Sequence, residues 1–301
     1  MAVSPATRTS VRLAVEPAAA SQKIKEAAFR GTLLFSTMIG LLFLAVLIVD
    51  VSRDGIALLS WEFLRSFPSR VTPETSGVRS ALLGTLLLII TTAVFIVPIG
   101  IATAVYLEEY ADRTRWWNRM IELNIQNLAA VPSVVYGILG LAWIVRGPLS
   151  LGRVLLAGAL TLGLLVLPVV IVVSREAIRA VPSSIRDGSL ALGATQWQTI
   201  WKQVLPGALP GIATGVILAL SRAIGETAPL ILVGAVAFAR FDPEGLMGSF
   251  SALPIQILEA VTDADTEFRD LAAAAILVLL AMLLVMNSVA IYLRNRYEQK
   301  W

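Results

Sequence analysis

The sequence predicts an all-α integral membrane protein with six transmembrane helices. Composition is the first reason: 57% of the 301 residues are hydrophobic and 15% are charged, whereas soluble domains average about 45–50% apolar and about 25% charged residues. The second reason is the recurrence of six long apolar stretches. At 1.5 Å per residue, each stretch can cross a hydrocarbon layer of ~30 Å, and a helix satisfies its own backbone polar groups there.

The six predicted spans follow one another with short connections. Residues 1–22, which precede them, are rich in Ala, Ser, Thr and Pro, a composition typical of an irregular tail. The first span is not followed by a small-residue cleavage site, so it is interpreted as an anchor and not as a signal peptide. The spans are residues 31–49, 80–107, 124–145, 151–173, 211–238 and 271–293.

The distribution of Lys and Arg predicts the orientation. With the N-terminus inside, 15 of the 24 Lys and Arg residues fall in cytoplasmic segments and eight fall outside. This bias favours cytoplasmic N- and C-termini. The last outer loop, 239–270, is acidic, which is typical of a solvated surface or of a contact with an extracytoplasmic protein.

Several enzyme classes are excluded by missing residue types. The chain contains no Cys and no His, which removes thiolate nucleophiles, imidazole bases and the common zinc sites, so no catalytic and no metal-binding residues are predicted. A phosphate-binding loop needs a Gly-Lys pair, and the chain has none. A membrane enzyme that uses only carboxylates remains an alternative. The net charge of +3 does not suggest a nucleic-acid partner.

The cytoplasmic segment between the fourth and fifth spans is predicted to form a helix–Gly–helix unit. Ser183 or Ser184 is placed to cap a helix that runs to Leu192, and Gly193 is placed to end it in a left-handed conformation. Thr195 and Gln198 have the spacing of a capping box that starts a second helix.

The second helix of this unit has one predicted apolar face. Trp197, Ile200, Trp201 and Val204 fall at positions i, i+3, i+4 and i+7, and Pro206 is expected to close the helix. Two interpretations stay open from these residues alone: an amphipathic helix that lies on the lipid surface, or an element that docks on a partner protein.

The same segment resembles the cytoplasmic signature of ATP-binding-cassette (ABC) importer permeases, E-A-A-x3-G-x9-I-x-L-P. In DGSLALGATQWQTIWKQVLP, Asp-Gly-Ser stands in place of Glu-Ala-Ala, and Gln203 in place of Ile. The resemblance implies a type I importer permease fold, in which this coupling loop, 174–206, docks on a cytoplasmic ATPase. The residues implied in docking are Asp187, Gly188, Ser189, Gly193, Thr195, Trp197, Leu205 and Pro206.

Longer stretches resemble one branch of that family, the phosphate permeases of the PstA type. They include NLAAVPSVVYGILGL (127–141) and SRAIGETAPL (221–230), and the resemblance covers roughly residues 78–293. It implies a permease domain of five spans at 78–293, preceded by a cytoplasmic tail at 1–30 and an anchor helix at 31–51, and followed by a cytoplasmic tail at 294–301.

The resemblance also implies a function and partners. The chain is expected to be a multi-pass subunit of a bacterial plasma-membrane phosphate importer, in contact with membrane lipid. The implied partners are a second permease of the PstC type, two ATPase subunits of the PstB type and a phosphate-binding protein of the PstS type. No cofactor is expected on this chain, because ATP and Mg²⁺ are used by the ATPase. The alternatives are a permease for another oxyanion or a secondary transporter, although internal repeats, which favour the latter, are not seen.

Two charges interrupt the fifth span. Arg222 and Glu226 are four residues apart, so one helical face is expected to carry both, together with the small residues Gly211 and Gly215. A charge at the bilayer centre costs about 2.5–3.5 kcal/mol on insertion scales, so both are expected to point into the bundle or a cavity. The resemblance implies that Arg222, Glu226 and Thr227 line the substrate pathway. A buried ion pair that fixes helix register is the competing interpretation.

Overall fold

The structure is a computed structural model that describes residues 20–112 and 114–297, and every regular element in these ranges is a helix. The chain divides into two compact units, residues 1–50 and 51–301. The elements up to the start of the fourth predicted span are α1 (Ala20–Gly55), α2 (Trp61–Arg65), η1 (Pro73–Thr75), α3 (Arg79–Val105), η2 (Tyr106–Tyr110), α4 (Trp116–Ala129), α5 (Ser133–Leu139) and η3 (Gly140–Val145). The remaining elements are α6 (Leu155–Arg179), α7 (Ser183–Ala191), α8 (Gln196–Thr199), η4 (Ile200–Val204), α9 (Leu205–Ile224), α10 (Ala228–Val233), α11 (Leu253–Thr262) and α12 (Thr266–Tyr297).

Helix α1 supplies the described part of the first unit. Its segment Lys25–Gly55 has 31 residues and a mean hydropathy of 2.6, which suits a membrane span. The helix begins at Ala20, so the prediction that residues 20–22 belong to an irregular tail is wrong, and the remainder of that tail, 1–19, lies outside the described residues. The division into tail, anchor and permease domain stays a prediction.

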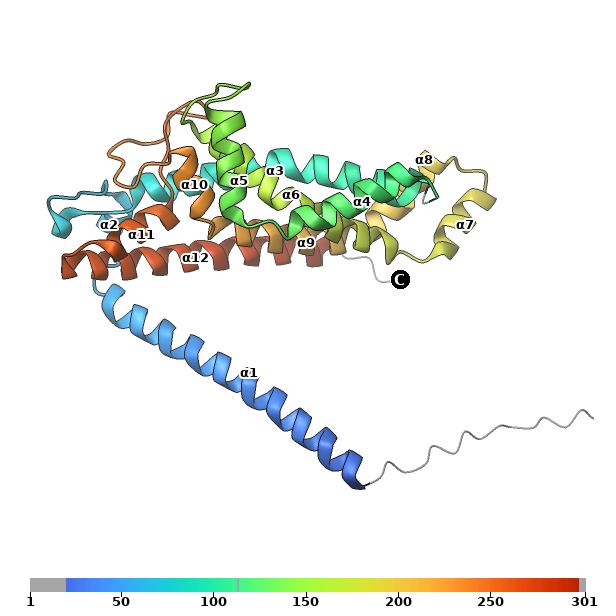
Figure 1. The fold of residues 1–301 in the computed structure, drawn as a ribbon, viewed down its shortest axis with the longest axis horizontal. Coiled ribbons are helices and arrows are strands. Elements are labelled where there is room, and N and C mark those ends of the chain that lie inside the picture. The colour runs from blue at the N-terminus through green and yellow to red at the C-terminus, as the bar shows by residue number, and fades with distance from the viewer. Residues whose placement is uncertain (1–19, 113, 298–301) are drawn as a thin grey trace, which may run out of the picture. The chain divides into compact units, whose positions relative to one another are not determined.

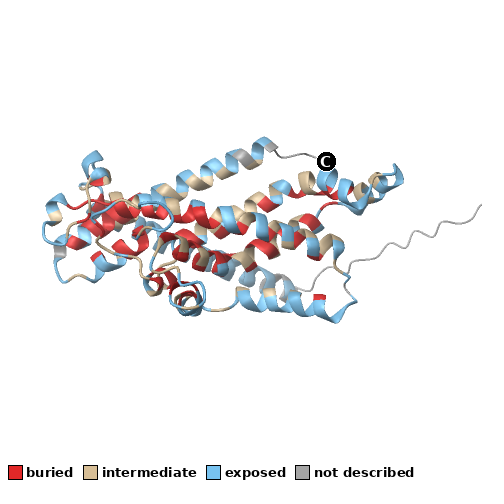
Figure 2. Cartoon of the chain, turned by 90° about the horizontal axis from the view of Figure 1, so that it is seen from above, coloured by how far each residue is buried: buried red, intermediate tan, exposed pale blue. Residues whose placement is uncertain are grey.

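The second unit is built around four long helices. Helix α6 packs against α3 on one side and α9 on the other, and α9 packs against α12 (Figure 1). Leu88 of α3, Leu162 and Val166 of α6 and Ala219 of α9 share one buried core. Figure 2 shows that buried residues run along these helices and that their outer faces are exposed. Such exposed apolar faces suit contact with lipid or with further membrane helices.

Small residues allow α9 to approach α6 closely. A Cβ atom added at Gly211 would lie 2.8 Å from the Cβ of Ala177, and one added at Gly215 would collide with Val173. The predicted packing role of the G-x-x-x-G face is therefore confirmed for these two glycines.

The third predicted span is a broken helix. Helix α4 ends at Ala129, and the helix that runs from Ser133 to Val145 leaves it at an angle of 107°. Pro132 explains the break, because proline disfavours the α conformation in the preceding residue and donates no backbone hydrogen bond. The buried Tyr136 hydroxyl donates to the carbonyl of Leu128 at 2.7 Å across the bend, and the Val131 amide donates to the same carbonyl at 3.1 Å.

The fifth predicted span, 211–238, also differs from the structure. Its helix is continuous from Gln196 to Ile224, then breaks, and the short α10 follows. Helix α10 packs against α5 so closely that a Cβ atom on Gly137 would lie 2.7 Å from the Cα of Pro229. Residues after Gly234, which has φ of 98°, are irregular up to α11. The two broken helices therefore lie against each other.

The two ends of the second unit carry different elements. Figure 1 shows α2 and α11 at one end and α7 and α8 at the other; these are called the α11 end and the α7–α8 end below. At the α11 end, Phe250 is fully buried, and the Leu155 amide at the start of α6 donates to the carbonyl of Gly248 at 2.9 Å. The acidic outer loop is thus partly packed, and Asp242 accepts hydrogen bonds from Arg79, one of them 3.1 Å long.

Candidate functional site

The α7–Gly193–α8 unit has the predicted form, with one change at its start. Helix α7 begins at Ser183, and Pro182, in an extended conformation, is its N-cap without a side-chain cap. The prediction of a serine cap is wrong because the chain leaves α6 through Pro182, which holds the extended backbone itself. Gly193 adopts φ of +84°, as predicted, and its amide donates to the carbonyl of Leu190 at 2.9 Å.

The predicted capping box at the start of α8 is confirmed. The Gln198 amide donates to the Thr195 hydroxyl at 3.3 Å, and the Thr195 amide donates to the Gln198 side-chain oxygen at 2.9 Å. The two helices are also linked directly, because the hydroxyls of Ser189 and Thr199 lie 2.9 Å apart. These bonds make α7 and α8 one local unit.

Pro206 does not close the second helix. The chain passes through the π-helical turn η4, in which the Leu205 amide donates to the carbonyl of Ile200, and continues as α9. The wider turn changes the hydrogen-bond pattern just before Pro206, which itself has no amide hydrogen to place. The second helix of the coupling loop and the following span therefore form one continuous 29-residue helix, Gln196–Ile224.

The predicted apolar face of this helix is divided between two environments. Ile200 and Val204 are buried, whereas Trp197 and Trp201 are more than half exposed. The two indole rings pack edge to face with centroids 5.3 Å apart. They line an apolar groove of about 480 Å³ together with Val105 and other residues at the end of α3.

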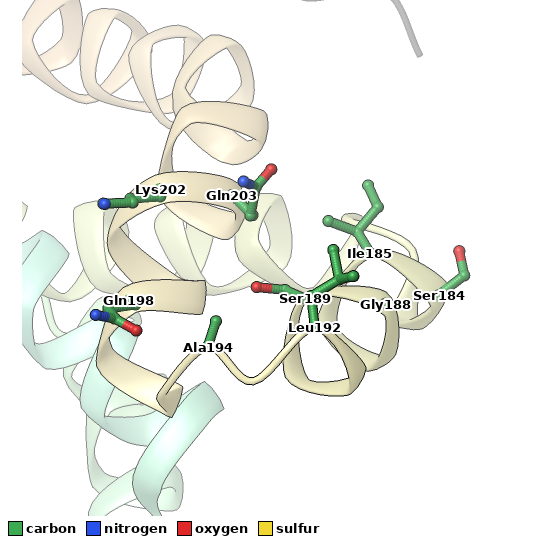
Figure 3. Close-up of a pocket in the computed structure, with 9 residues that line it drawn as sticks. All are labelled: Ser184, Ile185, Gly188, Ser189, Leu192, Ala194, Gln198, Lys202 and Gln203. Carbon is green, nitrogen blue, oxygen red and sulfur yellow. The ribbon is translucent and has the colours of Figure 1, made fainter.

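A second groove, of about 460 Å³, lies between α7 and α8 (Figure 3). Asp187 and Gly188 on α7 are exposed beside it, and Leu192 at the tip is 91% exposed. Leu205 and Pro206 lie where the unit joins α9 and are partly buried. The groove is lined by Ser184, Ile185, Gly188, Ser189, Leu192, Ala194, Gln198, Lys202 and Gln203.

Arg222 and Glu226 lie on either side of a helix break, and the prediction that one helix carries both is wrong. Arg222 is in the last turn of α9, which ends at Ile224, and Glu226 is in the link to α10. Gly225 weakens the helix, and Pro229, two residues into α10, favours a new start. Arg222 Nε lies 3.4 Å from Glu226 Oε1. Thr227 is the N-cap residue of α10 and makes no side-chain cap.

The exposure of the pair is uneven. The side chain of Arg222 is 55% exposed and that of Glu226 is 17% exposed. This chain's own helices therefore do not enclose Arg222, and the expectation that both charges point into the bundle or a cavity stays a prediction for Arg222. Its neighbour Ser221 donates to Asn287 of α12 at 2.6 Å. Asn287 lies six residues before the end of the predicted span 271–293, about 9 Å along a helix, so the pair lies within the apolar part of the bundle.

A cluster of glutamates and arginines at the α7–α8 end was not predicted from the sequence. Glu108 and Glu109 belong to η2, the π-helical turn that ends α3, and their side chains are only 6% and 10% exposed. The arginines come from α6 and α7. We call these five residues the glutamate–arginine cluster: Glu108, Glu109, Arg175, Arg179 and Arg186.

A sequence signal for this cluster was present. Two adjacent carboxylates at the C-terminal end of a helix interact unfavourably with the helix dipole, so cationic partners are expected near them.

The chain just after η2 carries a further local contact: Asp112 accepts from the Thr114 hydroxyl at 2.7 Å and from the Thr114 amide at 2.9 Å. The hydrogen bond from the Thr114 hydroxyl is the largest cause of the lowered pKa of Asp112, and the hydrogen bond from the Thr114 amide is the next.

These features define a multi-pass helical membrane protein that presents a two-helix unit at one end of its bundle. The chain belongs to the family described as binding-protein-dependent transport system inner membrane component, whose model matches residues 96–300. This is a family of membrane transport components, so the chain is assigned as a non-enzymatic, multi-pass transport subunit.

Named relatives are similar over much of the chain. The phosphate transport system permease protein PstA 1 of Mycobacterium tuberculosis (strain CDC 1551 / Oshkosh) is 37% identical over 199 residues, 65% of this chain. The match spans 64% of that relative's length. The phosphate transport system permease protein PstA of Pasteurella multocida (strain Pm70) is 30% identical over 281 residues, 93% of this chain and 96% of the relative.

A solved structure supports the fold. The crystal structure of a bacterial alginate ABC transporter, in complex with an alginate pentasaccharide-bound periplasmic protein, contains a chain similar to this one. The TM-score is 0.64 at 16% identity, over 93% of this chain and 98% of that chain. The predicted ABC importer permease fold is confirmed by this likeness and by the family match.

Proposed function

We propose that this chain is a permease subunit of an ATP-driven importer for inorganic phosphate. The observation that carries the proposal is Arg222, a cation more than half exposed on the single chain at a helix break in the apolar part of the bundle. A lipid-facing charge at that depth costs about 2.5–3.5 kcal/mol. A second permease subunit or a water-filled pathway must therefore cover this position. The names of the two PstA relatives support phosphate as the ion.

The chemistry of the Arg222–Glu226 pair suits a phosphate that must bind and leave. A guanidinium stays charged and offers paired donors that match phosphate oxygens. Glu226 lies 3.4 Å from it and moderates that attraction, because a permeation site must not hold its ion tightly. A carboxylate also accepts a hydrogen bond from a protonated phosphate oxygen, which a fully ionised oxyanion does not offer. Thr227, next to the pair, adds a hydroxyl at the start of α10.

The α7–α8 unit is proposed as the docking site of an ATPase subunit. Its exposed Leu192 and Asp187 offer an apolar and an anionic contact beside the groove between the helices. The proposed complex holds a second, PstC-type permease, two PstB-type ATPase subunits that bind ATP and Mg²⁺, and a PstS-type binding protein at the α11 end. This arrangement places the α7–α8 end and both termini in the cytoplasm.

Substitutions at the pair test the pathway role. Arg222→Gln removes the charge but keeps length and some hydrogen bonding, and phosphate uptake into proteoliposomes that contain the whole complex should fall by about tenfold or more. Arg222→Lys keeps the charge without the planar donors and should retain only partial uptake. Co-purification of the subunits checks that the variants assemble.

The double variant Arg222→Gln/Glu226→Gln separates transport from structure. If the pair only fixes helix register, removing both charges leaves no unpaired charge in the bundle, and the double variant regains the uptake that a single substitution loses. Restored uptake in this variant would contradict the pathway role, and lost uptake in an assembled complex supports it. Competition with sulfate distinguishes phosphate from another oxyanion as the substrate.

A further inference from the structure

Glu109 connects both helices of the α7–α8 unit to the end of α3. Its carboxylate accepts from Arg186 of α7, with Oε1 2.7 Å from Nη2 and 3.0 Å from Nε. Its backbone carbonyl accepts from the side-chain amide of Gln196, the first residue of α8, at 2.7 Å. One residue of η2 therefore contacts α7 through its side chain and α8 through its main chain.

Arg186 extends this connection to the end of α6. Its guanidinium donates to the carbonyl of Val181 at 2.7 Å and to the carbonyl of Ile178 at 2.9 Å. The same group therefore joins α7, the last turn of α6 and η2. Its side chain is 21% exposed and that of Glu109 is 10% exposed, so these charge-assisted bonds are largely shielded from water and are stronger than surface ion pairs.

Glu108 ties the same π-helical turn to α6 at a second point. Its carboxylate lies 3.2 Å from Nε of Arg175 and 3.1 Å from Nη2 of Arg179. Arg175 in turn pairs with Glu122 of α4 at 2.9 Å. Through these contacts η2 is held by α6, α7 and α8, and Arg175 links α6 onward to α4, although η2 belongs in sequence to the end of α3.

The placement of the glutamates is unfavourable without these partners. Two neighbouring carboxylates repel each other, lie at the negative end of the α3 helix dipole and are nearly removed from water. An apolar turn would pack in this position without such a cost. The charges instead provide directional contacts that specify how the α7–α8 unit sits on α3.

We propose that Glu109 is a positioning residue for energy coupling, which makes η2 the link between the α7–α8 unit and α3. A displacement of the unit by a docked ATPase is then passed to α3 and α6 as a rigid-body movement, because α7, α8 and η2 move together. The proposal rests on the proposed function in one respect, namely that an ATPase subunit docks on the α7–α8 unit.

Hydrogen–deuterium exchange on the unmodified complex tests the link without a mutation. Adding ATP to the complex of permeases and ATPase subunits should change amide exchange in Tyr106–Tyr110 together with exchange in Ser183–Val204. A change confined to Ser183–Val204, with η2 unaffected, would overturn the proposal. This measurement does not depend on the transported ion, so it remains informative if the substrate is not phosphate.

Substitution of Glu109 gives the second test. Glu109→Ala should lower phosphate transported per ATP hydrolysed by about tenfold while ATP hydrolysis persists, and Glu109→Asp, which keeps the charge, should restore part of the loss. Glu176→Gln is the matched control, because Glu176 is 63% exposed and its ion pair with Arg179, at 3.2 Å, lies within α6. An unchanged ratio in the assembled Glu109→Ala complex would refute the role. If that variant does not assemble, the ratio for Glu109→Asp and the exchange experiment decide.

Discussion

Gly193 is the residue of the α7–α8 unit whose identity the backbone constrains most directly. Its φ is +84°, and a Cβ atom added there would meet nothing within 4 Å. The cost of a side chain is therefore backbone strain and not a clash. Because the residue turns α7 into α8, that strain acts on the angle between the two helices.

We therefore expect Gly193→Val to cost about 1–2 kcal/mol locally and to impair coupling while the complex still assembles. The measurement is the ratio of ATP hydrolysis with and without the loaded binding protein, which should fall towards one. Gly152→Val is a matched control, since Gly152 has φ of +77° and equally open surroundings but lies just before α6, at the α11 end. An equal loss in both variants would mean that strain in general, and not the α7–α8 angle, is responsible.

Arg222 illustrates how a single residue is understood differently once the helix ends are known. The spacing to Glu226 indicated two groups on one face of a continuous helix, but α9 ends between them. The two side chains are joined only by a 3.4 Å contact across the break. Such a pair is freer to separate than one fixed on a helix face, which agrees with a role in transient binding.

Among the elements, the bent pair α4–α5 is linked across its bend by a side-chain hydrogen bond. Tyr136 is buried, and its hydroxyl donates to the Leu128 carbonyl at 2.7 Å. Without that donor, the Leu128 carbonyl keeps the hydrogen bond from the Val131 amide at 3.1 Å, so the loss is that of one hydrogen bond, about 0.5–1.5 kcal/mol.

Tyr136→Phe should therefore lower the thermal unfolding midpoint of the purified, detergent-solubilised complex by a few degrees, since about 0.5–1.5 kcal/mol is lost. Tyr292→Phe is the control, because Tyr292 on α12 is 63% exposed, and its midpoint should stay unchanged. Equal midpoints for the two variants would show that the hydroxyl of Tyr136 does not stabilise the bend.

Local sequence signals predicted which elements exist better than where they break. The apolar runs located the spans, and Gly193, Thr195 and Gln198 determined the α7–α8 turn through contacts between near neighbours. Proline was ambiguous, because Pro98 and Pro168 lie inside unbroken helices while Pro132 lies at a bend. The difference lies in tertiary packing, since α5 turns away to lie against α10.

The glutamate–arginine cluster could not be paired from the sequence for a related reason. Glu109 and Arg186 are 77 residues apart, and Glu108 and Arg175 are 67 apart. Their partnership depends on α3 and α6 ending at the same end of the bundle, which no local pattern encodes. Charge counting assigned these arginines to one side of the membrane, and they lie together at one end of the bundle, but it treated them only as orientation signals.

For the whole molecule, the membrane topology is constrained by which helix termini lie at the α7–α8 end and which lie at the α11 end of the second unit. Helix α12 runs antiparallel to α9, because Asn287 accepts from Ser221 and, further along α12, Arg294 donates to the Thr214 hydroxyl in the middle of α9 at 3.3 Å. The C-terminal end of α12 therefore points towards the α7–α8 end. The bent pair α4–α5 connects η2 at this end with the start of α6 at the α11 end, so the pair crosses the bundle. Counted as one span, it brings the number of candidate membrane spans in the described residues from five to six.

The absence of native Cys allows this topology to be tested with single introduced thiols. Ser249→Cys lies in the exposed loop at the α11 end, and Leu192→Cys lies at the tip of the α7–α8 unit, where the native side chain is 91% exposed. Because most Lys and Arg residues fall on the α7–α8 side, a membrane-impermeant maleimide added to intact cells should label position 249 and not position 192. The permease is expressed without ATPase subunits so that docking does not shield position 192, and permeabilised cells should label at both positions. Labelling of intact cells at 192 alone would invert the membrane orientation and place the proposed docking unit on the side where no ATP is available.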